Sequence, residues 1–174
     1  MGQNRRANYV QTTLQSSVVF EGRGLHTGKT VQVELRPAAA NTGIVFHRTD
    51  LTDGIAILPA KWDRVTVSPL NTRLSNDDGI TVSTIEHVMA ALAGCGVHNA
   101  IVAVNGPEVP IMDGSSAAFV RGILDAGLKN TGAPLKAIEV LKPILVAIGT
   151  ASARLVPAKS LQTEFEIEFS DRAI

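Results

Sequence analysis

The stretch Ser83–Gly96, STIEHVMAALAGCG, carries the strongest structural signal in the chain. Its large apolar side chains recur at the spacing of one helical face: Ile85, Val88, Met89 and Leu92. This pattern predicts an amphipathic helix that ends near Ala93, where Gly94 supplies a stop signal. Ser83 followed by Glu86 three residues later is the pattern of a capping box, so we place the start of the helix directly after Ser83.

The polar pair Glu86–His87 lies in the first turn of this helix. Glu86 is the only charged residue through Gly96, and a helix without a charged face is typical of one that is covered on both sides. We therefore expect the pair to face a second layer or a cleft. Adjacent Glu and His suit a metal ligand beside a general base. The alternative is a capping glutamate next to a hydrogen-bonded core histidine, because one ligand does not make a zinc site.

Strand patterns surround the helix. Apolar and polar residues alternate over Val31–Arg36, which predicts a half-buried strand, and Ile44–Phe46 and Ala100–Val104 read as short apolar strands. A second helix is expected from near Ser115 to Gly127. Its apolar stripe consists of Phe119, Val120, Ile123 and Leu124. Turn signals occur at Pro37–Thr42, Thr52–Gly54, Asn76–Gly79 and Asp113–Ser115.

The pattern after the second helix contains strands only, and we predict an α+β fold in four parts. Residues 1–9 form a flexible tail, 10–128 an N-terminal α+β domain, 129–136 a linker, and 137–174 the first strands of a second α+β domain. The strands expected there are Ala137–Val140, Ile144–Ile148, Ala153–Val156 and Thr163–Phe169. The stretch Ala151–Ala158 echoes Val31–Ala38 at an offset of about 120 residues, which leaves a duplicated unit or a chance likeness open.

The last predicted strand raises a packing problem. Phe165, Ile167 and Phe169 would lie on one face of it, and no residue follows Ile174 to cover them. An apolar sheet face needs a covering layer. We therefore expect a chain that is cut inside a domain or that borrows its cover from a partner.

Composition narrows the function classes. The chain has 174 residues, 45% of them apolar and 18% charged, which is too apolar for a disordered chain. Sixteen basic residues balance sixteen acidic ones, and aromatic residues make up 4%, which argues against nucleic acid as a partner. No apolar run is long enough for a transmembrane segment. The single cysteine, Cys95, and the absence of a signal-peptide pattern favour a cytoplasmic location.

The segment Gly28–Thr30, read Gly-Lys-Thr, is similar to the end of a nucleotide-binding loop. That loop needs a glycine where Arg23 stands, and it must open a helix, whereas a strand pattern follows here. We therefore expect a glycine turn between strands, with Lys29 in solvent. A second interpretation is a loop that presents His26 to a ligand. His47 and His98 are expected to be solvated.

Four motifs together resemble a known family over about Val10–Ile174. They are Gly24–Gly28 (GLHTG), Arg36–Ala38 with Asn41–Gly43, Ser83–His87 (STIEH) and Asn105–Ser115 (NGPEVPIMDGS). In order and spacing, these resemble the N-terminal part of the zinc-dependent UDP-3-O-acyl-N-acetylglucosamine deacetylases of lipid A synthesis. The resemblance implies two similar α+β domains in a β-α-α-β sandwich, of which this chain holds one complete domain and the first strands of the other.

The resemblance also implies roles for particular residues. The histidine that matches His87 binds the catalytic Zn²⁺, and the glutamate that matches Glu86 is the general base. The residues matching Leu25, His26 and Thr72 lie near the substrate. The remaining zinc ligands of the family, a His and an Asp, fall beyond position 174, so we expect this chain to be inactive alone.

The implied reaction is hydrolysis of the 2-acetamido group of UDP-3-O-(3-hydroxyacyl)-N-acetylglucosamine, with release of acetate. The implied partners are this UDP-sugar lipid precursor and a C-terminal half supplied by another chain. The alternative is a catalytically incomplete relative that binds a sugar nucleotide or a protein.

Overall fold

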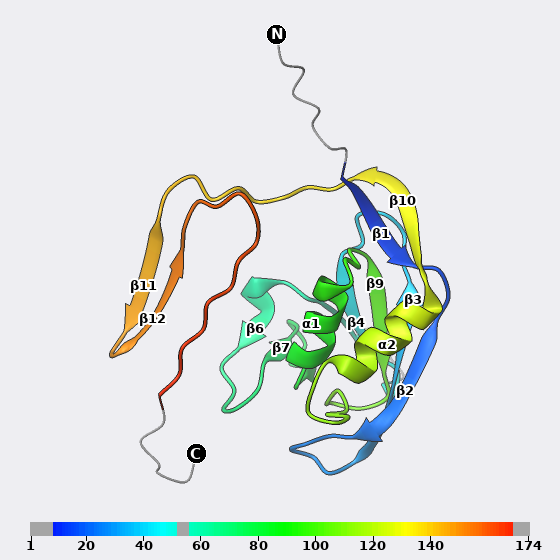
Figure 1. Ribbon diagram of the computed structural model, residues 1–174. Helices are drawn as coiled ribbons and strands as arrows, with labels where there is room; N and C mark the ends of the chain where they lie inside the picture. Colours follow the sequence, from blue (N-terminus) through cyan, green and yellow to red (C-terminus); the bar gives the residue numbers. More distant parts are fainter. Residues whose placement is uncertain (1–8, 52–55, 169–174) are drawn as a thin grey trace. The chain divides into compact units, whose positions relative to one another are not determined.

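A computed structural model of the chain describes residues 9–51 and 56–168 (Figure 1). The chain divides into two units, Met1–Leu135 and Lys136–Ile174. The turn expected at Thr52–Gly54, and the expected tail except for Tyr9, lie outside the described residues. The described part combines strands with two α-helices, which confirms the predicted α+β class.

A five-stranded sheet forms the frame of the first unit, in the order β2-β3-β9-β4-β5. The strands are β2 (Val18–Arg23), β3 (Thr30–Pro37), β9 (Ala100–Val104), β4 (Ile44–Arg48) and β5 (Ile57–Pro59). Neighbouring strands pair antiparallel except β4 and β9, which run parallel. In β3 the side chains of Val31, Val33 and Leu35 are buried, as the alternation predicts.

The helices α1 (Glu86–Gly94) and α2 (Ala117–Ala126) contact each other and lie against one face of this sheet (Figure 1). They bury Val88 and Leu92 from α1 and Phe119 and Ile123 from α2. The ring of Phe119 packs edge-on against Phe20 of β2, with 4.9 Å between the ring centroids. This aromatic contact fixes α2 on the sheet.

Three details of the helices differ from the prediction. Leu124 is 60% exposed, so it does not belong to the buried stripe of α2. Ala90 and Ala93 of α1 are exposed, so the first unit does not cover this helix on both sides. The start of α2 lies at Ala117, preceded by the expected turn at Asp113–Ser115, in which Asp113 Oδ1 accepts a hydrogen bond from the Ser115 N–H at 3.0 Å.

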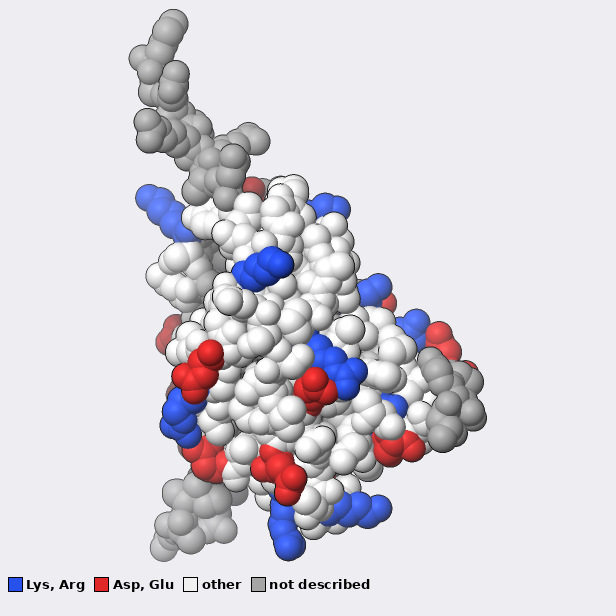
Figure 2. All heavy atoms as spheres, turned by 90° about the vertical axis from the view of Figure 1, so that its right-hand side faces the viewer, with Lys and Arg blue, Asp and Glu red and all other residues white. Residues whose placement is uncertain are grey.

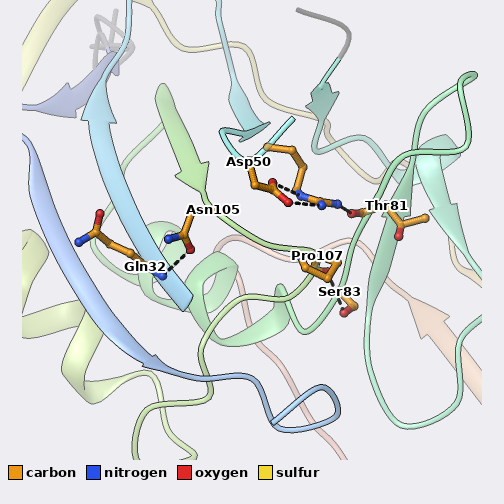
Figure 3. A network of polar contacts seen from close by, with 7 residues as sticks. Gln32, Asp50, Thr81, Ser83, Asn105 and Pro107 are labelled. Atoms are coloured by element: carbon orange, nitrogen blue, oxygen red, sulfur yellow. Dashed lines mark hydrogen bonds and ion pairs between the residues drawn. The ribbon is translucent and has the colours of Figure 1, made fainter. Parts of the chain in front are cut away.

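The predicted capping box is wrong. The Ser83 hydroxyl donates to the carbonyl of Pro107 at 3.2 Å, as Figure 3 shows, because Ser83 lies in a β-bridge with Glu108. Thr84 then turns the chain with a φ of 57°, and α1 begins at Glu86. Glu86 is therefore free to make a contact outside its own helix.

A three-stranded sheet, β6-β7-β8, leads into α1. Its strands are β6 (Val65–Thr66), β7 (Arg73–Ser75) and β8 (Thr81–Val82), preceded by the 3-10 helix η1 (Trp62–Arg64). The turn at Asn76–Gly79 joins β7 to β8 as predicted, with Gly79 at a φ of 75°. Arg48 of β4 holds this sheet to the larger one, because its side chain binds both Asp50 and the carbonyl of Thr81 (Figure 3).

The predicted linker at 129–136 is wrong over most of its length, although the two units divide near its end, between Leu135 and Lys136. Residues Leu128–Pro134 form strand β10, which pairs antiparallel with β1 (Val10–Leu14). Gly127, at a φ of 75°, ends α2 and turns the chain into β10. Asn130, Gly132 and Pro134 of β10 are typical of turns, so the sequence alone did not indicate a strand here. Its partner, β1, comes from the other end of the unit.

Within its described residues, 136–168, the second unit contains one hairpin, β11 (Ile144–Ile148) with β12 (Ala151–Leu155), joined by a turn with Gly149 at a φ of 60°. The strands expected at 137–140 and 163–169 are not formed in the part of these segments that the structure describes. Phe165 and Ile167 are 80% and 59% exposed, and Phe169 lies outside the described residues. A strand needs a pairing partner, and the described residues supply none there.

Candidate active site

The carboxylate of Glu86 is held by the segment that precedes β7. Its Oε2 accepts a hydrogen bond from the backbone N–H of Thr72 at 3.0 Å. The N–H of Ile85 donates to the carbonyl of Thr72 at 3.4 Å, so the two segments bind each other in both directions. The structure therefore brings together Thr72 and Glu86, two of the residues singled out by resemblance.

A cavity of about 280 Å³ opens beside Glu86. It is lined by Ala60, Lys61, Trp62, Val65, Thr72, Leu74, Ile85, Glu86 and Met89. Leu74 and Ile85 are buried, whereas Trp62 is 89% exposed. The cavity is thus apolar over most of its wall, with the Glu86 carboxylate as its acidic group. We expected the pair Glu86–His87 to face a second layer or a cleft, and of the two residues Glu86 lines this cavity.

His87 does not line this cavity. Its side chain is half-buried, and its backbone carbonyl accepts a hydrogen bond from the Ser116 hydroxyl at 3.0 Å, which links the N-terminal ends of the two helices. Among the described residues, no three His, Cys, Asp or Glu side chains gather into a group that could hold a metal. A half-buried imidazole has the chemistry of one zinc ligand, and a catalytic zinc needs three protein ligands.

Leu25 and His26 lie in the loop that joins β2 to β3, residues Gly24–Lys29. Both side chains are exposed, Leu25 by 60%. The loop closes on itself, because the N–H of Gly24 donates to the carbonyl of Lys29 and the N–H of Gly28 to the carbonyl of Gly24, each at 3.0 Å. A strand follows the loop, which confirms that it is not a nucleotide-binding loop of the helix-opening type.

Glu108 lies behind this loop, and the residue is 1% exposed. Its Oε1 accepts the N–H of His26 at 2.9 Å and the hydroxyl of Thr84 at 3.0 Å, and its Oε2 accepts the N–H of Thr27 at 2.8 Å. Burial by itself would raise the pKa of Glu108. The hydrogen bonds from His26, Thr27 and Thr84 outweigh burial and hold the pKa below its ordinary value.

Acid should weaken the fold partly through Glu108. Because its pKa is lower in the folded chain than in the unfolded one, its stabilising contribution is complete above the ordinary glutamate pKa and is lost as the pH falls through the lowered one. We expect the free energy of unfolding of Glu108→Gln to fall less steeply with acid than that of the unchanged chain. Urea unfolding at a series of acidic pH values measures both slopes, and parallel curves would contradict this expectation.

The chain is similar to proteins of a known family. Residues 11–174 match the model of the family described as "UDP-3-O-acyl N-acetylglycosamine deacetylase". The chain belongs to this family. The deacetylase of Geobacter sp. (strain M21) is 47% identical over 164 residues, which is 94% of this chain and 53% of that protein. The deacetylase of Shewanella sp. (strain W3-18-1) is 46% identical over 160 residues, 92% of this chain and 52% of its own length.

The chain thus spans about half the length of these relatives. Both are named UDP-3-O-acyl-N-acetylglucosamine deacetylase, so the relatives are hydrolases that act on a UDP-sugar lipid. This does not favour the alternative, a catalytically incomplete relative that binds a sugar nucleotide or a protein.

Four of the five predicted site residues fall into two groups in the structure, and the fifth, His87, does not line the cavity beside Glu86. Thr72 and Glu86 are in contact, and Leu25 and His26 share the loop that Glu108 holds. Sequence reasoning missed Glu108, although one signal was present. It is the only charged residue between Asn105 and Met112, a stretch rich in apolar residues and proline, and a lone charge in such a setting indicates a buried carboxylate with dedicated donors.

The other histidines differ from the solvated residues that we expected. His98 is half-buried, and its Nδ1 accepts the N–H of Thr12 at 3.1 Å. His47 is half-buried on β4. Figure 2 shows acidic and basic side chains interspersed over the face in view, without a block of one sign. Of the helices that the structure describes, none has the length and apolar character to cross a bilayer.

Proposed function

We propose that this chain is the N-terminal part of a zinc-dependent UDP-3-O-acyl-N-acetylglucosamine deacetylase and that Glu86 is its general base. The observation that carries the proposal is the Glu86 carboxylate at the wall of an apolar cavity, held through one oxygen by the Thr72 N–H. Family membership supplies the reaction class. The substrate is UDP-3-O-(3-hydroxyacyl)-N-acetylglucosamine, and the products are the free 2-amine and acetate.

The geometry suits a base that must stay in one place. The Thr72 N–H occupies Oε2, and Oε1 accepts no hydrogen bond from the described residues. A carboxylate fixed in this way can take a proton from the attacking water without reorienting. The apolar wall formed by Leu74, Ile85 and Met89 limits competing water around it.

His87 contributes one of the ligands for zinc in this proposal, and the other ligands come from the half of the enzyme that this chain does not match. Zinc, when bound, supplies Lewis-acid polarisation of the acetamide carbonyl. Glu86 precedes His87 at the start of one helix, so the base and this ligand are positioned by the same rigid element. Leu25, His26 and Thr72 contact the substrate.

Reconstitution tests the proposal. The chain is mixed with a polypeptide that spans the other half of a relative such as the Geobacter deacetylase, zinc is added, and acetate release from the substrate is measured. We expect release above the sum of the two parts alone. No gain from folded material, with both parts shown to associate, would contradict the proposal.

The metal role of His87 leads to a separate prediction. In the reconstituted mixture, His87→Ala should lower zinc affinity roughly 100-fold or more, because a catalytic site left with two protein ligands holds zinc poorly. Competition with a zinc-sensitive dye measures this affinity. His47→Ala is the matched control, since it removes a half-buried imidazole from strand β4. Equal zinc affinity for both variants would show that His87 is not a zinc ligand.

A further inference from the structure

The Glu108 carboxylate joins two parts of the chain that the proposed function places in one substrate site. One part is the loop Gly24–Lys29, which carries Leu25 and His26. The other is Thr84, two residues before Glu86. The carboxylate bonds to both parts at once, since its Oε1 accepts the N–H of His26 at 2.9 Å and the hydroxyl of Thr84 at 3.0 Å.

The loop is built around this carboxylate. Gly24 is buried, and a Cβ at this position would lie 2.3 Å from Glu108 Oε2 and 2.4 Å from the Thr27 hydroxyl oxygen. The loop therefore needs glycine at position 24 for the close approach of Glu108 rather than for a positive φ. The N–H groups of His26 and Thr27 both point at the carboxylate, an arrangement that favours an anion over a neutral amide.

Thr84 is held in a backbone conformation that its side chain disfavours. Its φ of 57° is uncommon for a β-branched residue, and the residue is 1% exposed. Such conformations persist where the surroundings fix them, and the Thr84 hydroxyl is fixed by its hydrogen bond to Glu108. The same turn sends the chain into α1 with Glu86 as its first residue.

We propose that Glu108 is a positioning residue that fixes the loop carrying Leu25 and His26 against the turn that sets the start of α1 and hence the place of Glu86. It acts through these two segments and does not touch the substrate. The structural part of the proposal stands on the contacts alone. Its effect on substrate binding rests on the proposed function.

Amide hydrogen exchange of the ¹⁵N-labelled chain tests the structural part. Exchange of the Thr27 N–H measures opening of the loop, and exchange of the Ile85 N–H, which donates to Thr72, measures opening of the turn. Exchange of the Val33 N–H in the central sheet measures global unfolding. In Glu108→Gln we expect exchange at Thr27 and Ile85 to accelerate about 10-fold or more relative to Val33. A side-chain amide has one acceptor oxygen, whereas both oxygens of the Glu108 carboxylate accept hydrogen bonds. Asp113→Asn is the control, since the side-chain hydrogen bonds that its carboxylate accepts within the described part of the chain come from nearby Ser115.

A second pair of variants separates the two segments. Thr84→Val removes the hydroxyl but keeps the shape, so exchange should rise at Ile85 while Thr27 stays protected. Thr84→Ser restores the hydroxyl and should restore protection at Ile85. If Glu108→Gln does not fold, the two Thr84 variants still test whether the bond between Glu108 and Thr84 holds the turn. Equal acceleration at Val33 in Glu108→Gln, or unchanged exchange at both Thr27 and Ile85, would overturn the proposal. So would Thr84→Val and Thr84→Ser behaving alike.

The reconstituted enzyme tests the effect on substrate. Glu108→Gln should raise KM roughly 10-fold, because the loop is assigned to binding, and should also lower kcat, because the turn that sets the place of Glu86 loses its bond to Glu108. Unchanged KM and unchanged kcat would contradict this. If the unchanged mixture releases no acetate, the proposed function fails, while the exchange measurements on the single chain still decide whether Glu108 joins the two segments.

Discussion

Replacing Glu86 by glutamine should lower kcat of the reconstituted deacetylase roughly 100-fold or more, in line with the loss of a general base. Glutamine has nearly the same size, and its carbonyl can still accept the Thr72 N–H that now binds Oε2. The cavity and the start of α1 should therefore stay as they are. What is lost is the ability to take a proton from water. Acetate release at saturating substrate measures the effect.

The control for this variant is Glu21→Gln, which neutralises an exposed carboxylate on β2. It should leave kcat unchanged. Zinc content should be the same in both variants, because Glu86 is assigned no ligand role. Full activity of Glu86→Gln would show that another residue is the general base. Loss of bound zinc together with activity would show that Glu86 is a zinc ligand.

The second large effect concerns stability. Phe119→Ala should lower the free energy of unfolding by about 3–5 kcal/mol, the range for removing a large aromatic side chain from a packed core. Phe119 is fully buried and packs on Phe20 with 4.9 Å between the ring centroids, so its loss leaves a cavity between α2 and β2. Urea unfolding of the single chain measures the change.

Leu124→Ala on the same helix is the matched control. Leu124 is 60% exposed, so its truncation should cost about 0.5 kcal/mol or less. Similar losses for the two variants would mean that α2 does not pack on the sheet through Phe119. The comparison also tests which side of this helix is buried, where the sequence pattern placed Leu124 wrongly on the inner face.

Local patterns predicted the elements whose signal lies within a few residues. The alternation over Val31–Leu35 indicated β3, the helical spacing from Ile85 to Leu92 indicated α1, and Asn76–Gly79 indicated the turn between β7 and β8. Each of these depends on the period of side chains along one segment. The family resemblance added Thr72, and the structure places its N–H against Glu86.

Features that depend on distant partners escaped prediction. β10 pairs with a strand about 120 residues earlier, so its own turn-forming residues suggested a linker. Ser83 bonds to Pro107 rather than capping α1, because a bridge to the segment after β9 takes up its hydroxyl. Glu108 received no role because its donors come from a loop and a turn that only the folded chain brings together.

Substrate binding to a reconstituted enzyme with strongly slowed turnover tests the central claim most directly. In the Glu86→Gln mixture the UDP-sugar lipid is expected to be hydrolysed at least about 100-fold more slowly, so the amide NMR signals of the ¹⁵N-labelled chain can be followed as the substrate is added. The account predicts saturable shifts for Thr72 and for the loop residues Leu25 and His26. Saturation of the enzyme by substrate with these signals unmoved would contradict it.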